Sequence, residues 1–140
     1  MLTHATVDQV DEIYRHFYNN KTWFPHVRKD YIQRQVEKGC CVYHNGIIIT
    51  YNKYKRKQKV GSEQANKGDI MLHQILNSKE GSGNAGIVLE QFFQMVCAPV
   101  WLTVRVENTR ATKFYEKHQM RSMGPITWMK GQLLGIVFLR

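Results

Sequence analysis

A glycine-containing segment between an expected strand and an expected helix carries the clearest chemical signal. The strand is expected at Asp69–Leu76, where apolar residues occupy both faces, and the helix at Asn84–Val96. In the loop between them, Asn77–Gly83, Gly81 and Gly83 let the backbone N–H groups turn inward. These groups and the helix dipole favour a phosphate or pyrophosphate ligand. The Gly-Lys-Ser/Thr ending of a Walker loop is missing, and a flexible surface turn is the alternative interpretation.

A second motif follows the next expected strand, Val100–Val106. Asn108 can cap a helix over Thr109–His118, and Tyr115 lies inside that helix. A plain helix cap and a core aromatic residue are the simplest interpretations of these two side chains.

The residues Val104–Met120 resemble the signature of the GCN5-related N-acetyltransferase (GNAT) family. That signature is a strand ending in Val-x-x-x-Asn, then x-x-Ala-x-x-Phe/Tyr-Tyr-Glu-Lys-x-Gly-Phe/Met, and it is matched around Asn108 and Tyr115. Gln119 stands where the family usually has glycine. The family's pyrophosphate loop, Arg/Gln-x-x-Gly-x-Gly/Ala, is matched at both loop glycines, with Ser78 in place of Arg/Gln.

The resemblance implies acetyl-CoA as cosubstrate and direct acyl transfer to a primary amine. Backbone groups of Leu76 and Asn77 would pair with the pantetheine arm, which Asn108 would also hydrogen-bond. Tyr115 would lie near the thioester sulfur, where a phenol, with its ordinary pKa of about 10, can protonate a leaving thiolate. The pyrophosphate would be held by the N–H groups of Lys79, Glu80, Gly81, Ser82, Gly83, Asn84 and Ala85.

Several residues are candidates for the general base. His73 lies in mid-strand, and an imidazole titrates in the useful pH range; a satisfied core residue is the alternative. Glu107, at a strand end beside Asn108, is either a base or an ion-paired carboxylate. Asp69 and Thr103 complete the set. Some family members carry an acid where this chain has Thr103, so a water chain is the alternative to a carboxylate base.

The acceptor amine is expected near Lys21–Arg28 and the final hairpin, Gly124–Gln132. Aromatic side chains in these segments either stack on a planar group or close the open end of the sheet. They are Trp23, Phe24, His26 and Trp128. In so short a chain, acceptor specificity must come from these segments or from a partner subunit, so a homodimer is one expected assembly.

Positive charge dominates the composition, with 20 Lys and Arg against 11 Asp and Glu and a formal net charge of +9. This excess favours anionic partners, and the phosphates of CoA account for a few charges. Five further cations lie around Tyr54, in either a solvated loop or a nucleic-acid contact. They are Lys53, Lys55, Arg56, Lys57 and Lys59.

Length and composition predict one domain, residues 1–140, with 43% hydrophobic residues to bury. No apolar run approaches the roughly 18 residues of a membrane-spanning helix, and Met1–His4 does not resemble a signal peptide. Cys40, Cys41 and Cys97 show no paired or metal-binding spacing. We therefore expect reduced thiols, no metal, no membrane association and a cytoplasmic protein.

The hydrophobic spacing predicts the elements that position these residues. Thr6 is expected to cap a helix through Asn19, a second helix covers Val27–Lys38, and Lys55–Lys67 is expected to be a loop. The further strands are expected at Leu2–Ala5, Cys40–His44, Ile47–Tyr51, Met123–Met129 and Leu133–Leu139. The order β-α-α-β-β-β-α-β-α-β-β describes a mixed α/β (α+β), GNAT-like domain with a single mixed β-sheet flanked by helices.

Three functions are consistent with these observations. The first is an N-acyltransferase for a small or protein amine. The second is a nucleic-acid-directed enzyme of the same fold that modifies a DNA base or an aminoacylated RNA. The third is a catalytically silent binding module, which the departures at Ser78 and Gln119 favour and the retained glycines, Asn108 and Tyr115 oppose.

Overall fold

The computed structural model describes all 140 residues, which fold into two compact units. The first unit comprises Met1–Tyr51 and Gln74–Met95. The second comprises Asn52–His73 and Val96–Arg140. Two strands, β2 (Ile47–Lys53) and β5 (Ile70–Asn77), carry the chain from one unit to the other. None of the helices combines the length and apolar character that crossing a membrane requires.

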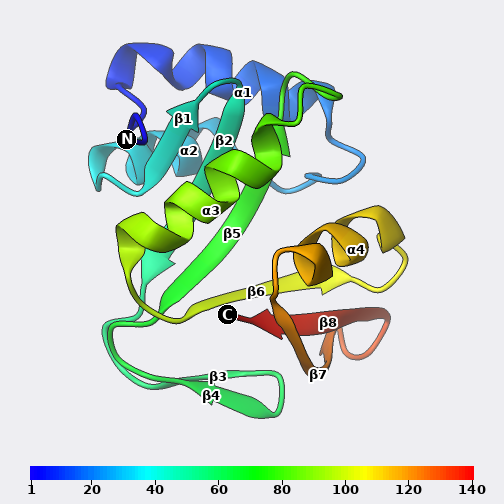
Figure 1. Ribbon diagram of the computed structural model, residues 1–140. Helices are drawn as coiled ribbons and strands as arrows, with labels where there is room; N and C mark the ends of the chain where they lie inside the picture. The colour runs from blue at the N-terminus through cyan, green and yellow to red at the C-terminus, as the bar shows by residue number, and fades with distance from the viewer. The chain divides into compact units, whose positions relative to one another are not determined.

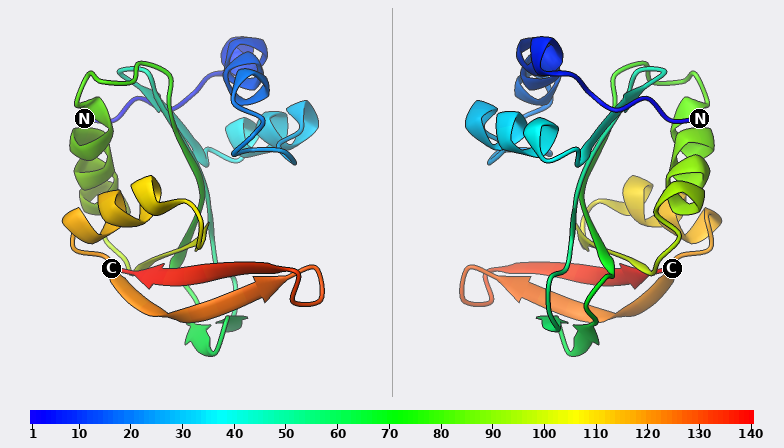
Figure 2. Two further views of the ribbon diagram at one scale, coloured as in Figure 1. Left: turned by 90° about the vertical axis from the view of Figure 1, so that its right-hand side faces the viewer. Right: turned by 90° about the vertical axis from the view of Figure 1, so that its left-hand side faces the viewer.

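The first unit packs helices on both faces of its strands, as Figure 2 shows for α1 and α2 on one face and α3 on the other. Besides parts of β2 and β5, its elements are η1 (Val7–Gln9), α1 (Val10–Asn19), α2 (Lys29–Glu37), β1 (Cys41–His44) and α3 (Asn84–Val96). Ile48 and Leu76 share a core with residues of α1 and α2. On the opposite face, the ring centroids of Tyr51 and Phe92 lie 5.0 Å apart. Burial on both faces explains the unbroken apolar run of β2.

The second unit places a helix on one face of its strands and a short hairpin on the other (Figure 2). Its further elements are β3 (Gln58–Val60), β4 (Glu63–Ala65), β6 (Val100–Arg105), α4 (Thr109–Lys117), β7 (Arg121–Trp128) and β8 (Leu133–Leu139). Phe138 of β8 packs against Tyr115 of α4, with ring centroids 5.9 Å apart. The neighbouring Val137 shares a core with Val60 and Ala65 of the hairpin. Successive side chains of a strand point to opposite faces of the sheet. Phe138 therefore faces α4, and Val137 faces the β3–β4 hairpin.

Backbone hydrogen bonds order the strands of the main sheet β1-β2-β5-β6-β8-β7, labelled in Figure 1, and pair β3 with β4 separately. The main sheet is mixed, because β5 runs parallel to β6 with Ile70 opposite Val100. The pairs β1–β2, β6–β8 and β7–β8 are antiparallel. The predicted fold class, a mixed sheet flanked by helices, is confirmed.

Two local predictions are wrong. The segment Lys55–Lys67, expected to be a loop, contains the β3–β4 hairpin, because Val60 and Ala65 are buried against residues far away in the chain. Each of these short strands has only one buried apolar residue, so the sequence shows almost no alternating hydrophobic pattern there. The expected strand Leu2–Ala5 is reduced to one isolated bridge between His4 and Val42.

Candidate functional site

The loop between β5 and α3, in the first unit, has the backbone geometry of an anion-binding turn. Gly81 and Gly83 adopt positive φ angles of 81° and 78°, a region that favours glycine. A Cβ on either glycine would meet no atom within 4 Å, so the space beside the loop is open. The side-chain oxygen of Asn77 accepts a hydrogen bond from the Lys79 amide at 2.9 Å, which turns the chain out of the strand.

The turn between β1 and β2 fixes both ends of this loop. The Ser78 amide and hydroxyl donate to the Gly46 carbonyl at 2.9 and 2.6 Å. The Asn84 side chain donates to the Asn45 carbonyl at 3.1 Å. The sequence does not predict that Asn45 and Gly46 anchor the glycine loop, because the contacting segments are more than 30 residues apart in the chain. The residue that replaces the family's Arg/Gln is therefore an anchor of the loop.

The first turn of α3 presents backbone N–H groups that have no acceptor within the helix. The Ser82 hydroxyl accepts from the Asn84 amide at 3.3 Å, whereas the amides of Gly81, Gly83 and Ala85 have no protein acceptor. Leu76, at the end of β5, is buried and holds the strand in place. The side chains of Lys79 and Glu80 balance in charge, so the attraction for an anion comes from the amides and the helix dipole.

In the second unit, Asn108 and Tyr115 lie at the start and in the interior of α4. The Asn108 side-chain oxygen accepts from the Ala111 amide at 3.2 Å, which confirms the helix cap and leaves the side-chain NH₂ group available. Tyr115 is only 8% exposed, and its hydroxyl makes no hydrogen bond. Burial raises the pKa of its phenol well above the usual range, so the group stays protonated at physiological pH.

Two of the candidate bases are carboxylates with structural partners. Asp69 is buried and accepts hydrogen bonds from the Trp101 indole N–H and the Asn66 amide, both at 2.9 Å. Glu107 forms an ion pair with Arg105. Hydrogen bonds from its own backbone amide and from Arg105 lower the pKa of Glu107. The ion-paired interpretation of Glu107 therefore fits its surroundings.

The other two candidates lie in strands of the second unit. His73 is exposed, so the alternative of a core histidine is wrong. Its Nε2 lies 2.9 Å from the side-chain nitrogen of Asn52. An amide nitrogen donates, so this contact assigns Nε2 as the acceptor and Nδ1 as the protonated nitrogen of the neutral ring. Thr103 is half-buried in β6 and has no titratable group.

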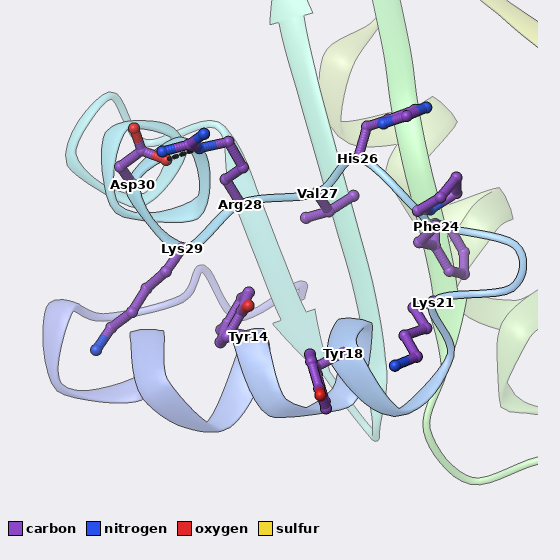
Figure 3. Close-up of a pocket in the computed structure, with 10 residues that line it drawn as sticks. Tyr14, Tyr18, Lys21, Phe24, His26, Val27, Arg28, Lys29 and Asp30 are labelled. Atoms are coloured by element: carbon purple, nitrogen blue, oxygen red, sulfur yellow. Dashed lines mark hydrogen bonds and ion pairs between the residues drawn. The ribbon is translucent and has the colours of Figure 1, made fainter.

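A pocket of about 530 Å³ lies in the first unit, between α1 and the segment that leads into α2 (Figure 3). Its lining consists of Tyr14, Tyr18, Lys21, Phe24, Pro25, His26, Val27, Arg28, Lys29 and Asp30. Of the four predicted acceptor residues, Phe24 and His26 therefore meet at this pocket. Trp23 is half-exposed outside the lining, and Trp128 lies in the second unit with its ring over Gly135.

Aromatic rings and cations dominate the pocket lining. The Lys21 ammonium group lies 4.8 Å from the centre of the Tyr18 ring. Asp30 is the single acid, and Arg28 and Arg34 bind it at 3.2 and 3.4 Å. The hydrogen bond from Arg28 lowers the pKa of Asp30, which stays ionised and paired. Such a lining suits a planar or anionic ligand group.

The element order and the glycine loop after β5 define the GNAT fold, and solved structures confirm it. The chain resembles a GNAT-family acetyltransferase from Streptococcus agalactiae, with a TM-score of 0.76 at 11% identity over 100% of this chain and 94% of that chain. Ard1 from Thermoplasma volcanium gives a TM-score of 0.76 at 14% identity, over 100% of this chain and 95% of that chain. Arabidopsis thaliana NAA60 in complex with acetyl-CoA gives a TM-score of 0.69 at 10% identity, over 100% of this chain and 96% of that chain.

No protein-family model matches the chain, and the search of curated proteins found no relative. The resemblance inferred from the residues around Asn108 and Tyr115 thus agrees with a likeness in three dimensions. That likeness establishes the fold, whereas the activity depends on the residues of the site.

Proposed function

We propose that the protein is an acyl-CoA-dependent N-acyltransferase that transfers an acetyl group from acetyl-CoA to a primary amine. The observation that carries the proposal is the loop after β5, where Gly81 and Gly83 hold positive φ angles beside open space at a helix N-terminus. The GNAT fold supports the proposal, as does the acetyl-CoA bound in the structure of Arabidopsis NAA60.

Three groups of this chain have the chemistry to bind different parts of a CoA molecule. The amides of the Lys79–Ala85 segment suit the pyrophosphate, because those of Gly81, Gly83 and Ala85 have no protein acceptor and lie at the N-terminus of α3. Backbone groups of Leu76 and Asn77 suit the amides of the pantetheine arm. The NH₂ group of Asn108 suits a carbonyl oxygen of that arm. Bound acetyl-CoA supplies a thioester, whose carbonyl carbon is the electrophile.

Tyr115 is the proposed general acid. As the amine nitrogen attacks the thioester carbon, the C–N bond forms, the C–S bond breaks, and the phenol gives its proton to the departing sulfur. Burial keeps the phenol protonated until that moment. A desolvated thiolate also has a raised proton affinity, which favours transfer to sulfur.

His73 is the proposed general base. Its imidazole is exposed, and the contact with Asn52 assigns Nε2 as the unprotonated nitrogen. To give its proton to Nε2, the amine must displace the Asn52 amide from that nitrogen's lone pair. Glu107 is the second candidate, but its ion pair and lowered pKa make it a weaker base.

The aromatic and cationic pocket of Figure 3 is the proposed acceptor pocket. The rings of Tyr14, Tyr18 and Phe24 provide flat apolar surface, and Lys21 and Arg28 provide positive charge. We therefore expect an acceptor whose amine is attached to a planar or anionic group. A polycationic amine is the disfavoured class, because these cations repel it.

Calorimetric titration of the protein with CoA and acetyl-CoA tests the proposal. The variants G81A and G83A are expected to lose most of the binding, because an alanine strains the turn and covers its open side. G39A and G68A are matched controls, since both replace a glycine at positive φ (72° and 93°) with no atom within 4 Å of the new Cβ. They are expected to lose folding stability but to keep CoA affinity. A folded protein that binds neither CoA nor acetyl-CoA would overturn the proposal.

Thiol release separates an enzyme from a silent binding module. The protein is incubated with acetyl-CoA and a panel of aliphatic, aromatic and phosphate-bearing amines, and free CoA thiol is measured. We expect release that depends on the amine, and acetylated amine by mass spectrometry. CoA binding without amine-dependent release across the panel would contradict the enzymatic role and leave the binding module.

A further inference from the structure

The two units differ sharply in charge. The second unit carries 13 Lys and Arg residues against four Asp and Glu, whereas the first carries seven of each. The whole net charge of +9 therefore belongs to the second unit. The glycine loop proposed to bind pyrophosphate lies in the first unit, which is neutral. CoA binding by that loop does not explain why the cations are concentrated in the other unit.

The basic segment, Lys53–Lys59, is the densest part of this charge. All five of its cations are exposed, and none of them forms an ion pair. None of the four acids of the second unit forms an ion pair with these cations, and Glu107 is paired with Arg105 instead. The positive field of the basic segment is therefore largely uncompensated within its own unit.

The basic segment is anchored at both ends. The amide of Tyr54 donates to the Asp69 carbonyl at 2.9 Å. At the other end, Val60 is buried, and a Cβ on Gly61 would lie 3.0 Å from the Pro125 carbonyl oxygen. A flexible solvated loop would have to be ordered when it binds, at an entropic cost, whereas the backbone on both sides of these cations is already fixed.

We propose that the basic segment binds the phosphate backbone of double-stranded nucleic acid without reading base sequence. A duplex has a dense row of phosphates, and contacts to phosphates provide affinity but no sequence information. Proteins that prefer single strands stack bases on exposed aromatic rings. No Phe, Tyr or Trp of the second unit is exposed.

An anionic membrane is the weaker match for the same charge. Helices and segments that bind membrane surfaces combine basic residues with apolar side chains that enter the lipid. No large hydrophobic residue between Asn52 and His73 is exposed. The basic segment therefore offers charge alone, which suits a phosphate backbone. The inference is independent of acyl transfer, and it is tested without acetyl-CoA.

Fluorescence anisotropy measures binding of the full chain to a labelled 20-base-pair duplex, to its single strand and to a duplex of unrelated sequence. We expect both duplexes to bind equally and more tightly than the single strand. With five phosphate contacts, the logarithm of the binding constant should fall with the logarithm of salt concentration with a slope of about −4 to −5.

The variants R56E and R15E form a matched pair, because both reverse one exposed arginine and they lie in different units. R56E is expected to weaken duplex binding roughly tenfold and to reduce the salt slope by about one, whereas R15E should leave both unchanged. The triple variant K55E/R56E/K57E should bind the duplex roughly a hundredfold more weakly, or worse. Thermal melts verify that each variant is folded.

Three outcomes would overturn the inference. Equal losses in R56E and R15E would show that net charge alone drives association. Binding of the single strand as tight as that of the duplex would exclude the preference for duplex phosphates. The third outcome is that neither duplex binds, whereas vesicles of phosphatidylserine and phosphatidylcholine bind the wild type and lose affinity for R56E. This result would assign the segment to a membrane surface.

Discussion

The backbone amide of Met120 donates a hydrogen bond to the carbonyl of Tyr115 at 3.1 Å and closes the end of α4. The amide of Gln119 donates to Glu116 at 3.0 Å, and Gln119 itself takes a positive φ of 65°. These two bonds form a Schellman ending, in which the residue with positive φ is usually glycine. The departure from the family signature at Gln119 therefore keeps the turn that follows the proposed acid, at the cost of backbone strain.

Replacing Gln119 by glycine is expected to stabilise the protein. Glycine adopts positive φ without steric conflict, so the variant Q119G should raise the free energy of unfolding by about 0.5–1 kcal/mol. Urea denaturation measures the change. Alanine suffers the same strain as glutamine, so Q119A serves as the control and should show no comparable gain. A Q119G protein less stable than the wild type would show that the Gln119 side chain makes a larger contribution than the strain.

Replacing Gly46 by alanine tests whether the β1–β2 turn holds the glycine loop. The new Cβ would lie 2.9 Å from the Lys79 side chain and 3.2 Å from the Ser78 hydroxyl oxygen. We expect G46A to lower both stability and CoA affinity, measured by urea denaturation and calorimetry. G39A has a similar φ and open surroundings, so it should lose about 1 kcal/mol of stability and keep the affinity. Equal CoA affinities in the two variants would mean that the loop does not depend on the turn.

Tyr115→Phe separates the hydroxyl of this residue from its ring. The ring of phenylalanine can still pack against Phe138, and the lost hydroxyl makes no hydrogen bond, so stability should change by less than about 1 kcal/mol. If the phenol is the general acid, turnover should fall roughly 10²–10⁴-fold while CoA affinity is retained. Thiol-release kinetics and calorimetry measure the two quantities. Undiminished turnover would remove Tyr115 from the mechanism.

Alkaline pH is expected to destabilise the fold through its tyrosines. Desolvation raises the pKa values of Tyr31, Tyr43, Tyr51, Tyr54 and Tyr115, to about 12 for Tyr43 and Tyr51. Phenols of the unfolded chain ionise at about pH 10. Stability is therefore complete below pH 10 and falls as the pH rises toward the folded-state values, by at most about 1.4 kcal/mol per pH unit for each group.

Thermal melts between pH 8 and 11.5 measure this loss for the wild type and for Y115F. The variant has one buried phenol fewer, so its melting temperature should fall less steeply above pH 10. Identical slopes in the two proteins would show that ionisation of Tyr115 in the unfolded chain does not contribute.

The surroundings of the candidate bases could be predicted from the sequence only in part. Asp69 and Glu107 are both acids near strand ends, but the sequence suggests an ion pair only for Glu107. The ion pair of Glu107 with Arg105 lies within the local sequence, whereas only the fold gives Asp69 a buried indole partner 32 residues away. The hydrophobic pattern likewise gave no sign that His73 would be exposed beside Asn52.

Local chemistry is sufficient to predict many features of this protein. Hydrophobic spacing predicted most helices and strands, glycine predicted the turn after β5, and Asn108 predicted the cap of α4, because backbone preferences act within a few residues. Only the tertiary structure revealed the anchoring of Ser78 on Gly46, the β3–β4 hairpin within the loop expected at Lys55–Lys67, and the concentration of charge in the second unit. The Ser78–Gly46 bond and the packing of the hairpin against Val137 join segments distant in the chain, and the charge concentration depends on which segments fold into one unit. Local patterns carry no information about such long-range packing.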